Sequence, residues 1–139
     1  MSVTGFDHVA IPTDRPEAML SFYRMLGFSA PDPAEWREQK MPFFSIQFGE
    51  NKINIHAPEL WRNERFELRG PTAKPGCGDF CFVWSGDLGD LFVALERAGA
   101  EVVEGPVERI GGQDGGRAQG TSVYTRDPDS NLLEFIVYG

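Results

Sequence analysis

The 139-residue chain has the size and composition of one folded domain, because 41% of its residues are hydrophobic and these include 11 Phe and 3 Trp. This composition excludes a disordered chain. The formal net charge of −8 also argues against a general nucleic-acid binder, which needs a basic surface to contact phosphates.

No segment of the sequence suggests secretion or a membrane. The start "MSVTGFDHVAIP" has neither a basic nor an apolar leader region, and no run approaches the roughly 20 apolar residues of a membrane span. Cys77 and Cys81 are too few for a disulfide framework or a zinc knuckle. We therefore expect a cytoplasmic protein whose two thiols are reduced and lie in or near the core.

The first half of the chain predicts a strand, a helix and a hairpin. Residues 6–11 alternate as a strand does, and residues 15–26 carry one apolar stripe between Pro16 and Gly27, as a helix does. Residues 30–42 are polar and contain prolines. The segments "FFSIQF" and "INIHA" then flank the turn "GENK", which indicates a hairpin.

The second half repeats this order after residues 57–76, where no period is visible and a connecting loop is expected. The predicted elements are the strand "DFCFVW", a helix in "GDLGDLFVALERAGA", the strand "EVVEGPVER", the Gly-rich loop "GGQDGGRAQG" and the hairpin "TSVYTRDPDSNLLEFIVY". An internal duplication of a strand-helix-strand-strand-strand unit therefore explains the chain best. We expect an α+β fold in a single domain, with module 1 at about 4–60, a linker at about 61–76 and module 2 at about 77–139.

Glu134 lies in the middle of the apolar run "SNLLEFIVYG". Burying an isolated carboxylate is costly unless it is paired, protonated or bound to a cation. Because strand side chains alternate, Glu134 lies opposite the apolar stripe of its strand. His8, His56 and Asp79 likewise lie opposite the apolar stripes of their strands.

These four residues occupy the first and last strands of the two halves, positions that we interpret as equivalent in the repeat. Two related sheets would bring them to one concavity, within one chain or across a dimer, and imidazoles with carboxylates suit a divalent metal. Simpler interpretations remain open for three of them. His8 could be a surface residue, His56 could end a strand and Asp79 could belong to a turn.

The segments "FDHVAIPTDRPEAMLSFYRMLGF" and "SVYTRDPDSNLLEFI" resemble the opening and the closing hairpin of the vicinal oxygen chelate (VOC) superfamily, which contains glyoxalases, bleomycin-resistance proteins and extradiol dioxygenases. This resemblance covers nearly the whole chain. It implies two paired βαβββ modules that form an open, incomplete β-barrel with helices outside. It also implies that such chains often pair as homodimers, with a site that can draw residues from both subunits.

The same resemblance implies metal ligands at His8, His56 and Glu134, with Asp79 at a position that is commonly His in the enzymes of the family. It implies a cofactor that is a divalent ion such as Zn, Ni, Mn or Fe. In such enzymes the metal binds two neighbouring substrate oxygens and stabilises an enediolate or related oxyanion. Glu134 would then also serve as the catalytic base. Asp79 departs from the family pattern, which weakens any assignment to one particular lyase, isomerase or dioxygenase.

Two functions from different classes follow for this chain. The first is a metal-dependent enzyme that acts on a small substrate with vicinal oxygens. The alternative is a metal-independent protein of the bleomycin-resistance type, which binds a drug or metabolite.

Three residues outside the metal set are candidates for contacting the substrate, namely Trp61, Arg65 and Arg117, since aromatic and cationic groups suit an anionic or aromatic ligand. For Trp61 and its neighbours, the competing interpretation is a solvated loop with one aromatic residue docked on the core.

Overall fold

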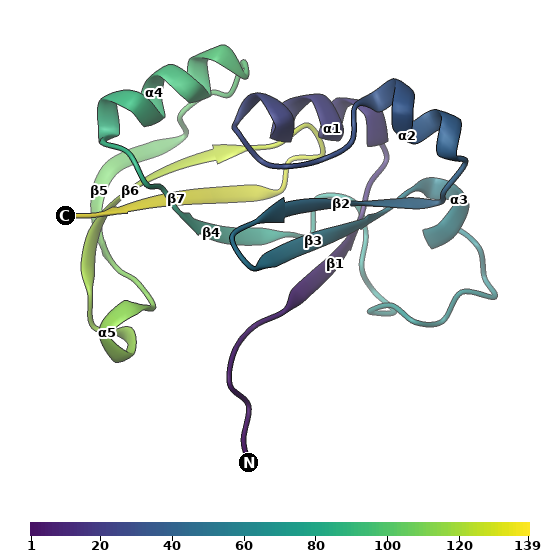
Figure 1. The fold of residues 1–139 in the computed structure, drawn as a ribbon, viewed down its shortest axis with the longest axis horizontal. Coiled ribbons are helices and arrows are strands. Elements are labelled where there is room, and N and C mark those ends of the chain that lie inside the picture. The colour runs from purple at the N-terminus through teal and green to yellow at the C-terminus, as the bar shows by residue number, and fades with distance from the viewer.

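A computed structural model describes residues 1–139 as two β-sheets that are covered by helices on one side (Figure 1). The first sheet has the strand order β1-β3-β2, and the second has the order β4-β7-β6-β5. The strands are β1 (His8–Pro12), β2 (Phe43–Phe48), β3 (Asn51–His56), β4 (Asp79–Val83), β5 (Glu104–Ile110), β6 (Gln119–Arg126) and β7 (Leu132–Tyr138). The helices are α1 (Pro16–Met25), α2 (Pro33–Gln39), α3 (Pro58–Trp61), α4 (Leu88–Arg97) and α5 (Gln113–Gly116).

The strand orders confirm the internal repeat and the expected α+β class. In each sheet the first strand of a module pairs in parallel with its last strand, as β1 does with β3 and β4 does with β7. The last strand then pairs antiparallel with the strand that precedes it. Neither sheet closes into a barrel. The expected open architecture with helices outside is therefore what the chain forms.

Module 1 departs from the expected pattern at its second strand. That strand is reduced to one isolated bridge between Ser29 and Gln47, whereas the corresponding strand of module 2 is the full β5. The polar stretch after Ser29 instead forms α2, capped by the Asp32 side chain and anchored by the buried Trp36. The expected loop over residues 57–76 also begins with a short helix, α3.

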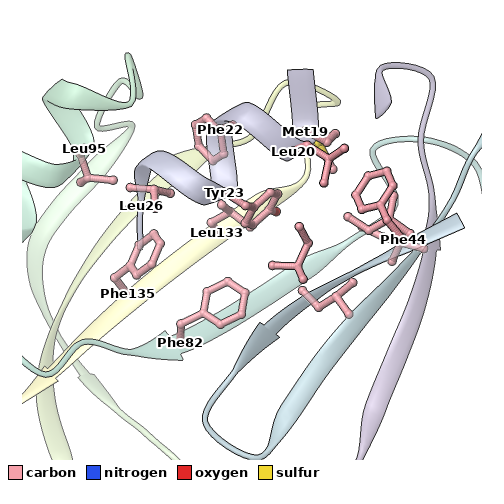
Figure 2. Packing of buried hydrophobic residues seen from close by; sticks show 14 of the residues in the cluster. Met19, Leu20, Phe22, Tyr23, Leu26, Phe44, Phe82, Leu95, Leu133 and Phe135 are labelled. Carbon is pink, nitrogen blue, oxygen red and sulfur yellow. The ribbon is translucent and has the colours of Figure 1, made fainter. Parts of the chain in front are cut away.

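Both modules bury their apolar faces in one core. On α1, Met19, Leu20, Phe22 and Tyr23 form the predicted buried stripe. On α4 the buried residues are Leu91 and Leu95. Figure 2 shows Tyr23 of α1 beside Leu133 of β7, and both belong to the same core cluster. This packing leaves the opposite faces of both sheets free to carry polar groups.

The turn "DPDSN" between β6 and β7 joins the two modules. Asp127 is buried and accepts hydrogen bonds from the Tyr23 hydroxyl (2.7 Å) and from the Asn131 side chain (2.8 Å). Asn131 in turn accepts from the Gly78 backbone N–H (2.7 Å), just before β4. Asp129 accepts from the Thr13 hydroxyl, in the segment that links β1 to α1. The turn thus fixes α1, β4 and the end of β1 relative to one another.

The two cysteines differ from expectation. Cys77 and Cys81 are free thiols, as expected, but both residues are exposed rather than buried in the core. Cys81 is exposed because it alternates with Phe80 and Phe82 along β4 and so lies on the polar face of the sheet. No helix in the structure is both long enough and apolar enough to traverse a bilayer.

Candidate functional site

The candidate site lies on the sheet faces that the helices leave open. In the first sheet Ile11, Ile53 and Ile55 face the core, so the alternating residues His8, Ala10 and Asn54 lie on the open face. In the second sheet Phe82, Leu133 and Phe135 face the core, and Asp79, Cys81 and Glu134 lie on the open face. Every predicted metal ligand therefore lies on a helix-free face.

Glu134 is half-buried and hydrogen-bonded rather than orphaned. The Ser122 hydroxyl donates to its carboxylate at 2.6 Å. Cys81 on β4 and Tyr124 on β6 are its direct partners in the two neighbouring strands, so their side chains flank the carboxylate. Polar neighbours on the same face thus account for how this charge is accommodated in an apolar strand.

The Glu134 carboxylate also acts on the groups that flank it. Burial of the thiol, together with the negative charges of Glu134 and Asp79, raises the pKa of Cys81 to about 12. Desolvation and Glu134 raise the pKa of the Tyr124 hydroxyl as well, and Arg109 partly offsets this. Both groups therefore stay protonated at neutral pH, and Cys81 is a poor nucleophile and a poor metal ligand in the single chain.

His8 and Asp79 occupy the same place in their modules, because each is the first residue of its first strand. Both are exposed. The Nδ1 atom of His8 lies 2.6 Å from a carboxylate oxygen of Asp7. An interaction of this kind fixes the imidazole and leaves Nε2 as the free ring nitrogen.

His56 lies away from His8. In the parallel pair of β1 and β3, His8 is opposite Lys52 and His56 is opposite Pro12. The two histidines are therefore separated by about 13 Å along the strands, whereas two donors of one metal ion lie within about 4 Å of each other. The His56 ring packs edge-on against Phe66 at 5.2 Å, and its pKa is lowered by burial and by Arg69. The structure does not bring the two imidazoles together.

The strand register also corrects the interpretation that His56 and Glu134 are equivalent in the repeat. Asp79 is paired with Leu132, and Glu134 is two residues further along β7. His8 is paired with Lys52, and two residues further along β3 is Asn54. Asn54 is therefore the counterpart of Glu134. Its amide oxygen accepts a hydrogen bond from the Ser45 hydroxyl at 2.8 Å.

The donor types on the open faces suit a divalent metal, but one chain does not assemble them. Imidazole and carboxylate donors, as in His8, Asp79 and Glu134, are ligands that zinc, nickel, manganese and iron accept. No three His, Cys, Asp or Glu side chains of the single chain lie together in a way that could hold an ion.

Two hollows lie along the seam between the sheets. Their volumes are about 550 Å³ and 440 Å³, which is within the size range of small-molecule sites. They share the residues Phe48, Asn51, Cys81 and Phe82. Cys81 connects this largely apolar seam to Glu134, while Asp79 lines the smaller hollow.

The predicted substrate-contacting residues lie far apart in the fold. Trp61 ends α3, is half-buried and donates from its indole N–H to the Thr13 carbonyl (2.8 Å), which holds it against the segment between β1 and α1. Arg65 is an exposed residue of the following loop. Arg117 follows α5, at the tip of the β5–β6 hairpin, where it pairs with Asp114 at 3.4 Å. The structure therefore gathers no binding site from these three residues.

Comparison with known proteins gives one family. The model of the "Glyoxalase/Bleomycin resistance protein/Dioxygenase superfamily" matches residues 5–135. Two relatives are each 34% identical over 99% of this chain. They are the "Glyoxalase domain-containing protein RDO1" of Mycosarcoma maydis, of which 70% is covered, and the "Virulence protein STM3117" of Salmonella typhimurium, of which 87% is covered.

Solved structures agree with the sequence matches. The crystal structure of STM3117 superposes with a TM-score of 0.81, at 34% identity and full coverage of both chains. An integron cassette protein from the V. cholerae mobile metagenome, VCH_CASS1, superposes with a TM-score of 0.78 at 30% identity, over 100% of this chain and 98% of that one. The fold is therefore shared with proteins of similar length.

Proposed function

This chain belongs to the glyoxalase/bleomycin resistance protein/dioxygenase superfamily, and from that premise we propose that it is a metal-dependent enzyme that acts on a small substrate with two neighbouring oxygens. The proposed site forms when the open face of the first sheet covers the open face of the second sheet of another copy. The observation that carries the proposal is that the polar positions of the two open faces are equivalent in the repeat. His8 matches Asp79 and Asn54 matches Glu134.

Charge complementarity supports the pairing of these faces. The open face of the first sheet carries His8 and Lys52. The open face of the second sheet carries the three carboxylates Asp79, Glu134 and Glu104 and one cation, Arg109, so it remains acidic in balance. Opposite charges that meet across an interface fix its register and favour association. A twofold pair of chains would form two such contacts, each with the same residues.

We propose that His8 of one copy and the Asp79 and Glu134 carboxylates of the other hold the ion, with the Asn54 amide beside them. His56 is left out because it is opposite Pro12, at the far end of the sheet from His8. A bound divalent ion would act as a Lewis acid on the two substrate oxygens. The donor set suits Zn, Ni, Mn or Fe and does not select one of them.

The chain's own residues have distinct parts in this proposal. Glu134 takes a proton from the substrate carbon, since it is the half-buried carboxylate of the face and the Ser122 hydroxyl holds it at 2.6 Å. The Tyr124 hydroxyl accepts from Arg109 (3.1 Å) and lies against the Glu134 carboxylate, so it helps to hold that carboxylate in place. The apolar seam beside Cys81 takes the body of the substrate and excludes water there.

The test is metal content measured by elemental analysis on tag-free protein that has been incubated with each candidate ion. Wild type is expected to hold close to one ion per chain. His8→Ala and Glu134→Ala are expected to hold at least about tenfold less, because each removes a ligand. His56→Ala is the matched control and is expected to keep its metal. Wild type that takes up none of the supplied ions would overturn the proposal.

Ligand binding measured with and without a chelator separates the enzyme from the metal-independent binding protein. The observation that favours the binding protein is that a single chain brings no three ligands together. If the protein is a metal-independent binding protein, its acidic, aromatic-lined surface should bind a cationic ligand tightly. A chelator would leave the affinity for that ligand unchanged. Loss of ligand binding on chelation favours the enzyme.

A further inference from the structure

Arg109 lies on the open face of the second sheet without a carboxylate partner. Its Nε donates to the Tyr124 hydroxyl at 3.1 Å, and its Nη1 donates to the Glu108 backbone carbonyl at 3.0 Å. The ion pairs of the chain involve Arg37, Arg62 and Arg117, together with His8, but not Arg109. A guanidinium has five N–H donors. Several donors of Arg109 are therefore left for a ligand.

The position of this guanidinium is fixed relative to Glu134. Its central carbon lies 5.7 Å from the centre of the Tyr124 ring, a cation–π distance that holds the side chain over the ring. Tyr124 is paired with Glu134 on the neighbouring strand. Arg109 itself is paired with Gly120, four residues before Tyr124 on β6, so its side chain extends along the open face to reach the Tyr124 hydroxyl beside Glu134.

The sheet surface beside Arg109 is apolar, and no large side chain projects from it at Gly120. Gly120 is paired directly with Arg109 and has no side chain to cover it. The Ile136 side chain occupies that space, since a Cβ added at Gly120 would lie 2.7 Å from it. A cation, a hydroxyl and an apolar floor are the groups that hold a carboxylate attached to an apolar body.

We propose that Arg109 and Tyr124 bind a carboxylate of the substrate, so that the substrate class is an organic acid with neighbouring oxygens held near Glu134. The inference rests on the proposed function for the role of Glu134 but not for the anion site itself. Arginine suits this task because its planar fork matches two carboxylate oxygens. In a chain with a net charge of −8, a fixed cation is also what attracts an anion locally.

The test uses benzoate and its uncharged isostere benzamide on metal-free protein, followed by NMR titration. Wild type is expected to prefer benzoate by about tenfold or more. Arg109→Met is expected to abolish the preference without changing the affinity for benzamide, and Tyr124→Phe to reduce it. Arg97→Met, at an exposed arginine of the helix side, is the matched control and is expected to keep the preference.

The outcomes distinguish this inference from the proposed function. A benzoate preference that depends on Arg109 in a protein that takes up no metal would support the anion site and overturn the metal-dependent enzyme. Metal uptake with equal or no binding of the two probes would overturn the anion site. A preference that persists in Arg109→Met would overturn it too, because another cation would then be responsible.

Discussion

Cys77 and Cys81 are both exposed, but the surroundings of Cys81 make its thiol unreactive. A pKa of about 12, caused by burial of the thiol and by the Glu134 and Asp79 carboxylates, leaves almost no thiolate at pH 8. We expect iodoacetamide to modify Cys77 about tenfold faster or more, measured by peptide mass spectrometry. Glu134→Gln should accelerate only Cys81, while Glu96→Gln on α4 should change neither rate. Equal rates in wild type would contradict this account of Cys81.

Asp127 gives a second prediction at a single residue. It accepts from the Tyr23 hydroxyl, the Asn131 side chain and the backbone N–H groups of Asp129 and Asn131. Both oxygens of the Asp127 carboxyl group can accept hydrogen bonds in either protonation state, whereas the NH2 group of asparagine accepts none, so Asp127→Asn should lower the free energy of unfolding by about 1–3 kcal/mol in urea titrations.

The pH dependence of that loss follows from the direction of the pKa shift. Burial raises the pKa of Asp127 above its usual 3.8, so the folded state binds the proton more tightly than the unfolded state. The contribution of Asp127 to the free energy of unfolding is complete below the pKa that this residue has in the unfolded state. It decreases as the pH rises through the higher pKa of the folded state. The advantage of wild type over Asp127→Asn should therefore be larger in acid. Asp114→Asn, at an exposed position, should show no such trend, and an advantage that grows with pH would refute the assignment.

Strands β5 and β6 approach each other closely next to the candidate site, and only a glycine fits at the point of contact. Gly105 has φ +101°, and a Cβ there would lie 2.4 Å from the Ser122 carbonyl oxygen. Gly105→Ala should therefore destabilise the chain by about 2 kcal/mol or more, measured by chemical denaturation. It should also weaken metal or ligand binding, since Ser122 holds Glu134. Gly112→Ala, where φ is −82° and space is open, should change stability by less than about 0.5 kcal/mol. Equal effects of the two substitutions would refute this.

Elements with a strong local period could be predicted from the sequence, and short ones could not. Helix α1 has four buried residues on one stripe and a glycine with φ +94° just past its end, and both signals are visible in the sequence. Helix α2 has seven residues and only Trp36 buried, so its apolar period is too short to detect. The single bridge at Ser29 depends on pairing with Gln47, which is a tertiary contact.

The sequence predicts on which face of its strand each candidate residue lies, but not which residues of other strands lie beside it. Alternation correctly put His8, Asp79 and Glu134 on open faces, because it is a property of each strand alone. To decide between His56 and Asn54 as the counterpart of Glu134, one needs the parallel register of β1 and β3. That register joins strands that are distant in sequence, so alternation within one strand does not reveal it. Tyr124 could have been found by counting back across the "DPDSN" turn from Glu134, since the two residues are paired in that hairpin.

At the scale of the whole molecule, the two open faces explain why the metal site would need a second copy. One chain presents His8 on one sheet and Asp79 with Glu134 on the other, and no three of its ligand-type side chains lie together. In a twofold dimer each site would take His8 from one chain and the carboxylates from its partner. Wild type should therefore sediment as a dimer, and loss of the dimer should remove the metal.

Complementation between defective variants tests whether the ligands come from different chains. His8→Ala and Glu134→Ala should each form dimers without a complete site. In a heterodimer, the Glu134→Ala chain supplies His8 and the His8→Ala chain supplies Glu134 and Asp79, so one of the two sites is complete. A random 1:1 mixture should recover about a quarter of the wild-type metal content, because half of its dimers are heterodimers with one complete site each.

The double variant His8→Ala/Glu134→Ala distinguishes shared sites from sites within one chain. Mixed with wild type at 1:1, it leaves wild-type dimers with two sites and heterodimers with none, because each site in a heterodimer lacks one ligand. Metal content should then be about a quarter of the all-wild-type value rather than a half. A recovery of one half would mean that each chain holds its own ion. His8 and Glu134 would then have to approach each other within one subunit.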